Sequence, residues 1–386
     1  MTRPAPSSLP GFPPPAHARL LKACLVEDDS AIAHWHAWRR DLNFDDIDNA
    51  SQRLIPLLHH NLHRLGVPTD APDMGRYAGL HRRTWYENAA AVAQAAAVIK
   101  ELSAAGIPTL VLKGTALASA HYHAGGLRPV GDADLLVPAQ HAPAALQLLL
   151  GKGWEPRPQR TAATLLSVDL HKRHGWEIRN DDGRGFDLHW RLLAVSADAS
   201  LDTPFWDAAM PLRLQGTPTL TLSAPHHLLH VCVHGLCLGQ VPAYHWVADA
   251  AMILRHPGPA GFDWDAFLAA ARLQRVERFA SSALRHLAGV FAIPIPDRVL
   301  SDLDSAPLAR WQHVEFNAFT TFNPAVRRSY YCWHRLGRLR TCSTAWAARP
   351  AWLAYLRMMQ LQWEAPTLAH LPLAGTRKLL RRVRPT

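Results

Sequence analysis

Two aspartates, Asp132 and Asp134, form an Asp-x-Asp pair in the segment 127–138. The adjoining Leu-Leu-Val at 135–137 is typical of a buried strand, and side chains two positions apart on a strand point to the same face. Both carboxylates are therefore expected on one face, where their repulsion is costly unless a cation lies between them. Paired carboxylates on a strand commonly hold Mg²⁺ against the phosphates of a nucleotide.

A second motif precedes the aspartate pair. Lys113, Gly114 and Thr115 follow a short apolar strand predicted at 109–113 and open a helix predicted at 114–122. Glycine lets the backbone approach a phosphate, and the amides at a helix start point toward an anion. Lys113 adds a positive charge. The motif predicts a phosphate-binding turn, with ordinary strand-to-helix punctuation as the alternative.

Three more side chains are candidates for the same site. Asp187, on a strand predicted at 186–190, would complete a set of three carboxylates that could hold two Mg²⁺ ions. Arg128 either contacts the triphosphate or forms a structural salt bridge to the aspartate cluster. His189 shares the strand face of Asp187, and it either orients that carboxylate or contacts the substrate.

Three histidines follow one another at helical spacing: His226, His230 and His234. Zinc binding is one interpretation. Ordinary helix packing is favoured, because three histidines on successive turns lie too far apart to reach one ion. His234 alone is expected near the site, with Asp249 as its partner.

The order of the predicted elements places these motifs in an α/β module. Helices are expected at 73–105, 143–150, 226–238, 244–255, 263–289, 308–319 and 343–362, and strands at 130–137, 176–179 and 186–190. The predicted regions are a flexible lead at 1–15, an N-terminal helical region at 16–105, an α/β core at 106–223, a helical domain at 224–300 and a C-terminal helical region with a basic tail at 301–386.

The composition sets the broad class of the protein. Of 386 residues, 48% are hydrophobic and 19% charged, which excludes a mainly disordered chain. The net charge of 41 − 31 = +10 suits nucleotides, nucleic acid or an anionic membrane surface, but it is also common in arginine-rich proteins. Five cysteines without a CxxC pair indicate neither a disulfide framework nor a zinc site, so we expect a cytoplasmic protein. No signal peptide or transmembrane segment is expected.

The order strand, glycine turn, helix, Asp-x-Asp and late single Asp resembles the nucleotidyltransferase fold of DNA polymerase β and aminoglycoside nucleotidyltransferases. The local sequence motifs are similar to those of the uncharacterised bacterial nucleotidyltransferase family (the NTP_transf_5 type). The matching segments are Val111–Leu117 (VLKGTAL), Leu127–Val137 (LRPVGDADLLV), Phe186–Arg191 (FDLHWR), Pro225–Gly235 (PHHLLHVCVHG) and Trp246–Ala250 (WVADA). The resemblance runs from about Leu54 to about Val290. The wider superfamily has Gly-Ser at the first turn, where this chain has Lys113 and Gly114.

The resemblance implies an α/β (α+β) fold, with a mixed-sheet core between N-terminal and C-terminal helical regions. It implies Mg²⁺-dependent transfer of a nucleoside monophosphate from an NTP, such as ATP, to an unidentified acceptor, with release of pyrophosphate; Mn²⁺ is an alternative ion. Asp132 and Asp134 would bridge the metals, and Asp187 would help to deprotonate the acceptor. Lys113, Gly114 and Arg128 would hold the triphosphate.

The acceptor could be a small molecule, a peptide or a natural-product intermediate. One alternative function is a catalytically inactive nucleotide-binding scaffold or regulator. The other is a toxin-like enzyme that modifies tRNA, which the +10 charge permits but does not select. The arginine-rich tail at 377–384 either binds RNA or a membrane surface or is simply solvated.

Overall fold

The computed structural model describes residues 11–40, 42–180, 183, 185–195, 199–237, 244–259, 261–320, 326, 330, 332–334, 336, 348–363 and 365–376. Most of the predicted flexible lead and all of the basic tail at 377–384 lie outside the described residues. The first residues of the helix predicted at 343–362 lie outside them as well.

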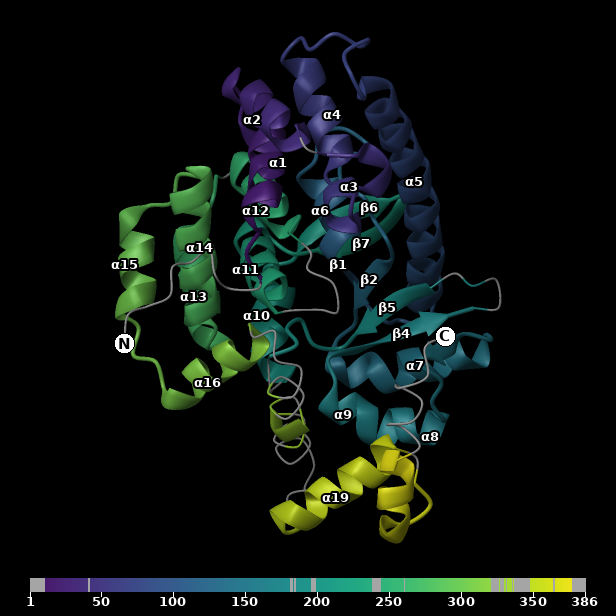
Figure 1. Ribbon diagram of the computed structural model, residues 1–386. Helices are drawn as coiled ribbons and strands as arrows, with labels where there is room; N and C mark the ends of the chain where they lie inside the picture. The colour runs from purple at the N-terminus through teal and green to yellow at the C-terminus, as the bar shows by residue number, and fades with distance from the viewer. Residues whose placement is uncertain are drawn as a thin grey trace.

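A seven-stranded mixed sheet forms the centre of the molecule (Figure 1), in the order β3-β4-β5-β2-β1-β7-β6. The strands are β1 Leu110–Leu112, β2 Ala133–Leu136, β3 Glu155–Arg157, β4 Gly175–Arg179, β5 Gly185–His189, β6 Met210–Leu214 and β7 Thr217–Thr221. The central strand β2 is parallel to β5 and antiparallel to β1, and β1 is parallel to β7. This mixed sheet with flanking helices confirms the predicted α/β fold.

Helices precede, interrupt and follow the sheet. Before it come α1 Pro15–Leu25, α2 Ser30–Arg39, α3 Asn49–Gln52, α4 Ile55–Arg64 and α5 Met74–Ala104. Between strands lie α6 Lys113–Ala120, α7 Ala142–Gly151, α8 Ala162–Thr164, α9 Leu170–Lys172 and α10 Thr203–Asp207. After it come α11 Ala224–Leu236, α12 Trp246–Arg255, α13 Trp264–Leu273, α14 Glu277–Phe291, α15 Asp297–Ser305, α16 Arg310–Phe319 and α19 Ala351–Gln362.

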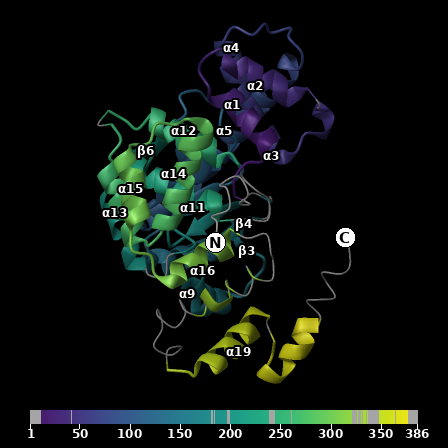
Figure 2. The same cartoon turned by 60° about the vertical axis from the view of Figure 1, so that its left-hand side comes forward.

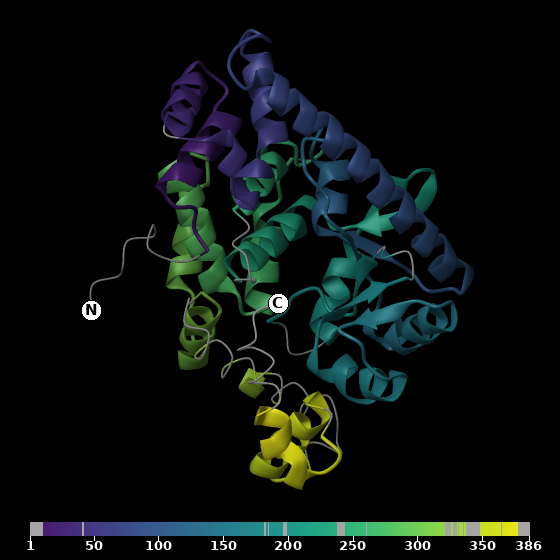
Figure 3. The same cartoon turned by 45° about the vertical axis from the view of Figure 1, so that its right-hand side comes forward.

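The two faces of the sheet are covered by different helices because alternate strand residues point to opposite sides. Leu110 and Leu112 of β1 belong to the larger core, with α1, α4 and α11 to α14. Val111 belongs to a second core with the C-terminal half of α5 and with α7. Figure 3 shows the long helix α5 lying along one side of the sheet. The two helical layers therefore cover opposite faces of the sheet.

The C-terminal helix α19 lies apart from the sheet (Figure 2). Its residues Ala354 and Met358 form a small hydrophobic cluster with Leu336. Throughout the described ranges, none of the helices combines the length and the apolar character needed to cross a membrane.

Two local features differ from the sequence prediction. The helix expected at 263–289 is broken, because Arg275 has a φ of +54° and ends the first half. The hairpin β6–β7 was not predicted, since Pro211 and Pro218 weaken both strand patterns. Its turn residues, Gln215 and Gly216, both have positive φ, as tight hairpin turns require.

Candidate active site

The register of two parallel strands creates the site. Asp134 of β2 lies opposite Asp187 of β5, and Leu136 lies opposite His189. Paired residues on neighbouring strands project to the same face, and so do residues two apart on one strand. Asp134, Asp187 and His189 therefore gather on one face of the sheet.

The distances confirm that these three side chains are close. One potential ligand atom from each of Asp134, Asp187 and His189 lies within 4.8 Å of the others. His189 Nε2 lies 2.9 Å from Asp134 Oδ1, so the hydrogen bond of this histidine goes to Asp134 and not to Asp187. Carboxylate oxygens suit Mg²⁺ and Mn²⁺, and an imidazole nitrogen is accepted by many divalent transition metals. The donor set fits one divalent cation.

Lys113 lies among the same carboxylates. Its Nζ donates a hydrogen bond of 2.5 Å to Asp134 Oδ1 and is 4.0 Å from Asp187 Oδ2. Burial alone would raise the pKa of Asp134, but the charge of Lys113 and the hydrogen bond from His189 hold that pKa well below its usual range. Asp134 is therefore a permanent anion, whereas burial and the charge of Asp134 raise the pKa of Asp187.

Asp132 lies apart from that group, which corrects the expectation that both aspartates project from one strand. The strand β2 begins at Ala133, so Asp132 belongs to the bend that leads into it. Asp132 keeps more of its surface exposed than Asp134 and His189, which are buried, but neighbouring atoms displace part of the water around its carboxyl group. Loss of surrounding water, followed by the charges of Asp134 and Asp187, raises the pKa of Asp132 to about 6.

Asp132 should therefore destabilise the metal-free protein above pH 6. The carboxyl titrates at 3.8 when unperturbed and at about 6 when folded, so ionisation removes stability from the wild type between these values. We expect Asp132→Asn to raise the melting temperature at pH 8 in EDTA, with the gain shrinking to nothing below pH 4. Thermal unfolding of both proteins from pH 4 to 8 measures this. An equal difference at all pH values would contradict it.

A cavity of about 180 Å³ adjoins the site. Its polar lining includes Arg53, Lys113, Arg128, His230, His234 and His245. Burial lowers the pKa of each of these histidines, in the case of His234 to about 3, so they are neutral at pH 7. Three carboxylates, those of Asp132, Asp134 and Asp249, line the cavity as well, so its lysine and two arginines are formally balanced.

The three helical histidines do not act together. His230 and His234 line the cavity from α11, whereas His226 lies near Ser223 and packs edge-on against Phe205. The expectation that His234 alone would approach the site is too narrow, since His230 does so as well. The expected pairing of His234 with Asp249 is wrong, because Asp249 binds other residues.

Arg128 is bound to Asp249 rather than to the aspartate cluster. Arg128 Nε and Nη2 donate to the two carboxylate oxygens of Asp249 at 2.8 and 2.9 Å, and Tyr122 donates to Oδ1 of the same carboxylate at 2.8 Å. All three side chains are buried. Arg128 and Asp249 therefore form a buried ion pair in the wall of the cavity.

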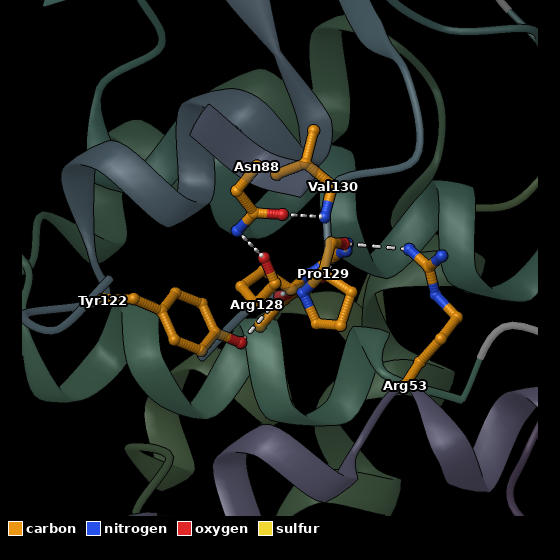
Figure 4. A network of polar contacts seen from close by, with 7 residues as sticks. Arg53, Asn88, Tyr122, Arg128, Pro129 and Val130 are labelled. Atoms are coloured by element: carbon orange, nitrogen blue, oxygen red, sulfur yellow. Dashed lines mark hydrogen bonds and ion pairs between the residues drawn. The ribbon is translucent and has the colours of Figure 1, made fainter. Parts of the chain in front are cut away.

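The segment around Arg128 is held by further hydrogen bonds (Figure 4). Asn88 of α5 donates to the carbonyl of Arg128 and accepts from the amide of Val130, each at 2.8 Å. Arg53 donates to the carbonyl of Pro129 at 3.0 Å. This network fixes the stretch of chain that delivers Asp132 to the site.

Arg53 is the functional candidate that sequence reasoning missed. It lines the cavity and donates a hydrogen bond to a backbone carbonyl, and no carboxylate among the described residues is paired with it. Arg53 and Pro129 are 76 residues apart, so no local pattern connects them.

The turn at the start of α6 contributes Gly114 to the cavity wall. Gly114 lies next to Arg128 there, since a Cβ atom at this position would be 3.4 Å from Arg128 Nη1. Thr115 is fully buried, and its hydroxyl has no hydrogen-bond partner within the described part of the chain.

A second opening meets the first at Asp132. It is a groove of about 720 Å³ between α5 and the β4–β5 pair, and Gly131 and Asp132 line both this groove and the cavity. Tyr86 and Trp154 supply aromatic surface to it, and Ala90 presents a small side chain. Two separate openings that share one carboxylate suit a reaction between two substrates.

The comparisons agree with this arrangement. A family model described as an uncharacterised nucleotidyltransferase matches residues 49–292, more than half of the chain. The matched range contains the whole candidate site, from Arg53 to Asp249. No curated protein matches the chain.

Proposed function

Because this chain belongs to the uncharacterised nucleotidyltransferase family, we propose that it transfers a nucleoside monophosphate from an NTP to an acceptor, using Mg²⁺ or Mn²⁺. The observation that carries the proposal is the register of Asp134 with Asp187, which gathers two carboxylates and His189. They lie beside a cavity whose mixed lining includes the cations Arg53 and Lys113. Nucleotidyl transfer needs a cation between carboxylates and a place for three phosphates.

Asp134, Asp187 and His189 would hold the metal ion. When bound, the ion supplies electrostatic stabilisation of the charge that develops around the α-phosphorus. An acceptor hydroxyl oxygen forms a bond to this phosphorus while the bond to the β-phosphate bridging oxygen breaks, and pyrophosphate leaves. We assign the proton of the hydroxyl to Asp132, because Asp132 borders both openings whereas Asp187 lines neither.

Asp132 can take this role because it is ionised at pH 7. Without a metal ion its pKa is raised only to about 6, and the charge of a bound cation would favour the ionised form further. The groove beside α5 would admit the acceptor, and the cavity would admit the triphosphate.

Arg53 would bind the triphosphate, since it is a cation with no carboxylate partner within the described ranges. A charge-assisted hydrogen bond contributes about 1.5–3 kcal/mol, so we expect Arg53→Ala to weaken NTP binding by about 10- to 100-fold. Isothermal titration with a non-hydrolysable ATP analogue and Mg²⁺ measures this. Arg82→Ala, at an exposed position of α5, is the matched control and should bind as the wild type does.

The direct test is incubation with each radiolabelled NTP, Mg²⁺ or Mn²⁺, and cell extract as the source of acceptor. Labelled product resolved by size separates a small molecule, a peptide and RNA, and pyrophosphate release is measured in parallel. Metal-dependent NTP binding without pyrophosphate release would contradict transfer and favour an inactive nucleotide-binding scaffold. Label on RNA ends, with binding that weakens steeply as salt is added, would favour the tRNA-modifying alternative.

A further inference from the structure

Lys113 occupies the position that a cation between the carboxylates would take. Its Nζ is 2.5 Å from Asp134 Oδ1 and 4.0 Å from Asp187 Oδ2, the two carboxylates whose oxygens, with His189, form the metal-ligand group. An ammonium and a divalent ion cannot both occupy that space. Metal binding must therefore move the Lys113 side chain.

The backbone at Lys113 directs the side chain inward. Its φ of +47° lies in the left-handed region, which is unfavourable for a residue with a side chain. Such conformations persist where the surrounding structure enforces them, and they are concentrated at functional sites. The hydrogen bond from Lys113 to Asp134 is one of the contacts that hold the residue in this conformation.

The cavity offers Lys113 an alternative partner. Lys113 lines it together with Arg53, close to the helix start at Gly114. A triphosphate bound there would bring negative charge next to the ammonium. Lys113 thus lies between two sites of negative charge, one permanent and one that arrives with the nucleotide.

We propose that Lys113 is an internal counter-ion that holds the metal-free site together and, when the metal ion displaces it, turns into the cavity to bind the triphosphate. The inference rests on the proposed function and adds an order of binding to it. Metal and nucleotide would bind cooperatively, because the first releases the group that the second needs.

The first test compares the wild type with Lys113→Met. Removing the competing ammonium should tighten the binding of Mn²⁺ alone, measured by electron paramagnetic resonance, by about tenfold or more. Lys152→Met, at a surface position, is the matched control and should leave the affinity unchanged. Equal or weaker Mn²⁺ binding by Lys113→Met would contradict the proposal.

The second test uses a non-hydrolysable ATP analogue. In EDTA, Lys113→Met should bind the analogue as tightly as the wild type, because without metal the Lys113 side chain of the wild type is bound to Asp134 and does not contact the phosphates. With saturating Mg²⁺, the variant should bind it about tenfold more weakly. An equal loss of affinity for the analogue under both conditions would mean that Lys113 contacts the phosphates with or without metal. This result would overturn the proposed displacement of Lys113 by the metal ion.

The third test needs no variant, so it holds even if Lys113→Met folds poorly. Brief amine acetylation of the wild type, followed by mass spectrometry, should modify Lys113 several-fold faster when Mg²⁺ is added. Lys100 and Lys152 serve as internal controls and should not change. An unchanged rate at a metal concentration that saturates the site would refute the displacement.

The outcomes separate this inference from the proposed function. Pyrophosphate release by the wild type, together with an unchanged acetylation rate of Lys113, would contradict the displacement of Lys113 but support nucleotidyl transfer. Metal-dependent exposure of Lys113 without any pyrophosphate release would do the opposite.

Discussion

Replacing Asp134 with Asn is expected to lower the rate of nucleotidyl transfer by about 10³-fold, because a loss of about 4 kcal/mol of metal-borne transition-state stabilisation has that effect. Asp134 is buried, it accepts from both Lys113 and His189, and its low pKa keeps it charged at any working pH. Asn has the same shape but no charge. It would leave the metal with one buried anionic ligand fewer.

The fold should survive this substitution, because Lys113 retains the nearby charges of Asp187 and Asp132. Single-turnover release of labelled pyrophosphate measures the rate, and circular dichroism and thermal unfolding check the structure. Asp70→Asn, at an exposed position, is the matched control. Turnover of the folded Asp134→Asn protein within tenfold of the wild type would remove Asp134 from the mechanism.

Replacing Asp249 with Ala should reduce the free energy of unfolding by about 3–5 kcal/mol, the usual effect of leaving one partner of a buried ion pair uncompensated. Arg128 would lose both of its hydrogen bonds to the carboxylate, and the Tyr122 hydroxyl would lose its acceptor. Since Arg128 belongs to the network that holds the segment before β2, transfer should fall as well.

Urea unfolding monitored by circular dichroism measures this effect. The double substitution of Arg128→Met with Asp249→Leu should recover part of the lost stability, because a buried ion pair can often be replaced by apolar side chains. Asp70→Ala is the control for loss of a surface carboxylate. A decrease below 1 kcal/mol, within the range of ordinary surface pairs, would show that the network carries little of the stability.

The elements around the site were predictable because their signals are local. Short continuous apolar runs gave β1 and β2, and alternating apolar residues gave β4 and β5. The turn at Lys113 and Gly114 gave the start of α6. The edge strands β3 and β6 were missed, and so was β7 beside β6, because short, proline-containing segments become strands only when a neighbour pairs with them.

The partners of the charged side chains were not predictable from the sequence. Arg128 and Asp249 are 121 residues apart, and their pairing depends on how α12 packs against the segment that precedes β2. The sequence suggested that Asp132, Asp134 and Asp187 form the metal site. The structure gathers Asp134 and Asp187 with His189, because β2 lies parallel to β5 in that register, whereas Asp132 precedes β2.

The sequence by itself determined the residue types of the site, their order along the chain and the family, because motifs and strand alternation depend on neighbouring residues. Only the tertiary structure decided which carboxylates converge, that Arg53 is available as a cation and that Lys113 lies where a metal ion would bind. The physical reason is that charge–charge interactions act over a few ångströms in space, and strand register and helix crossing set those distances.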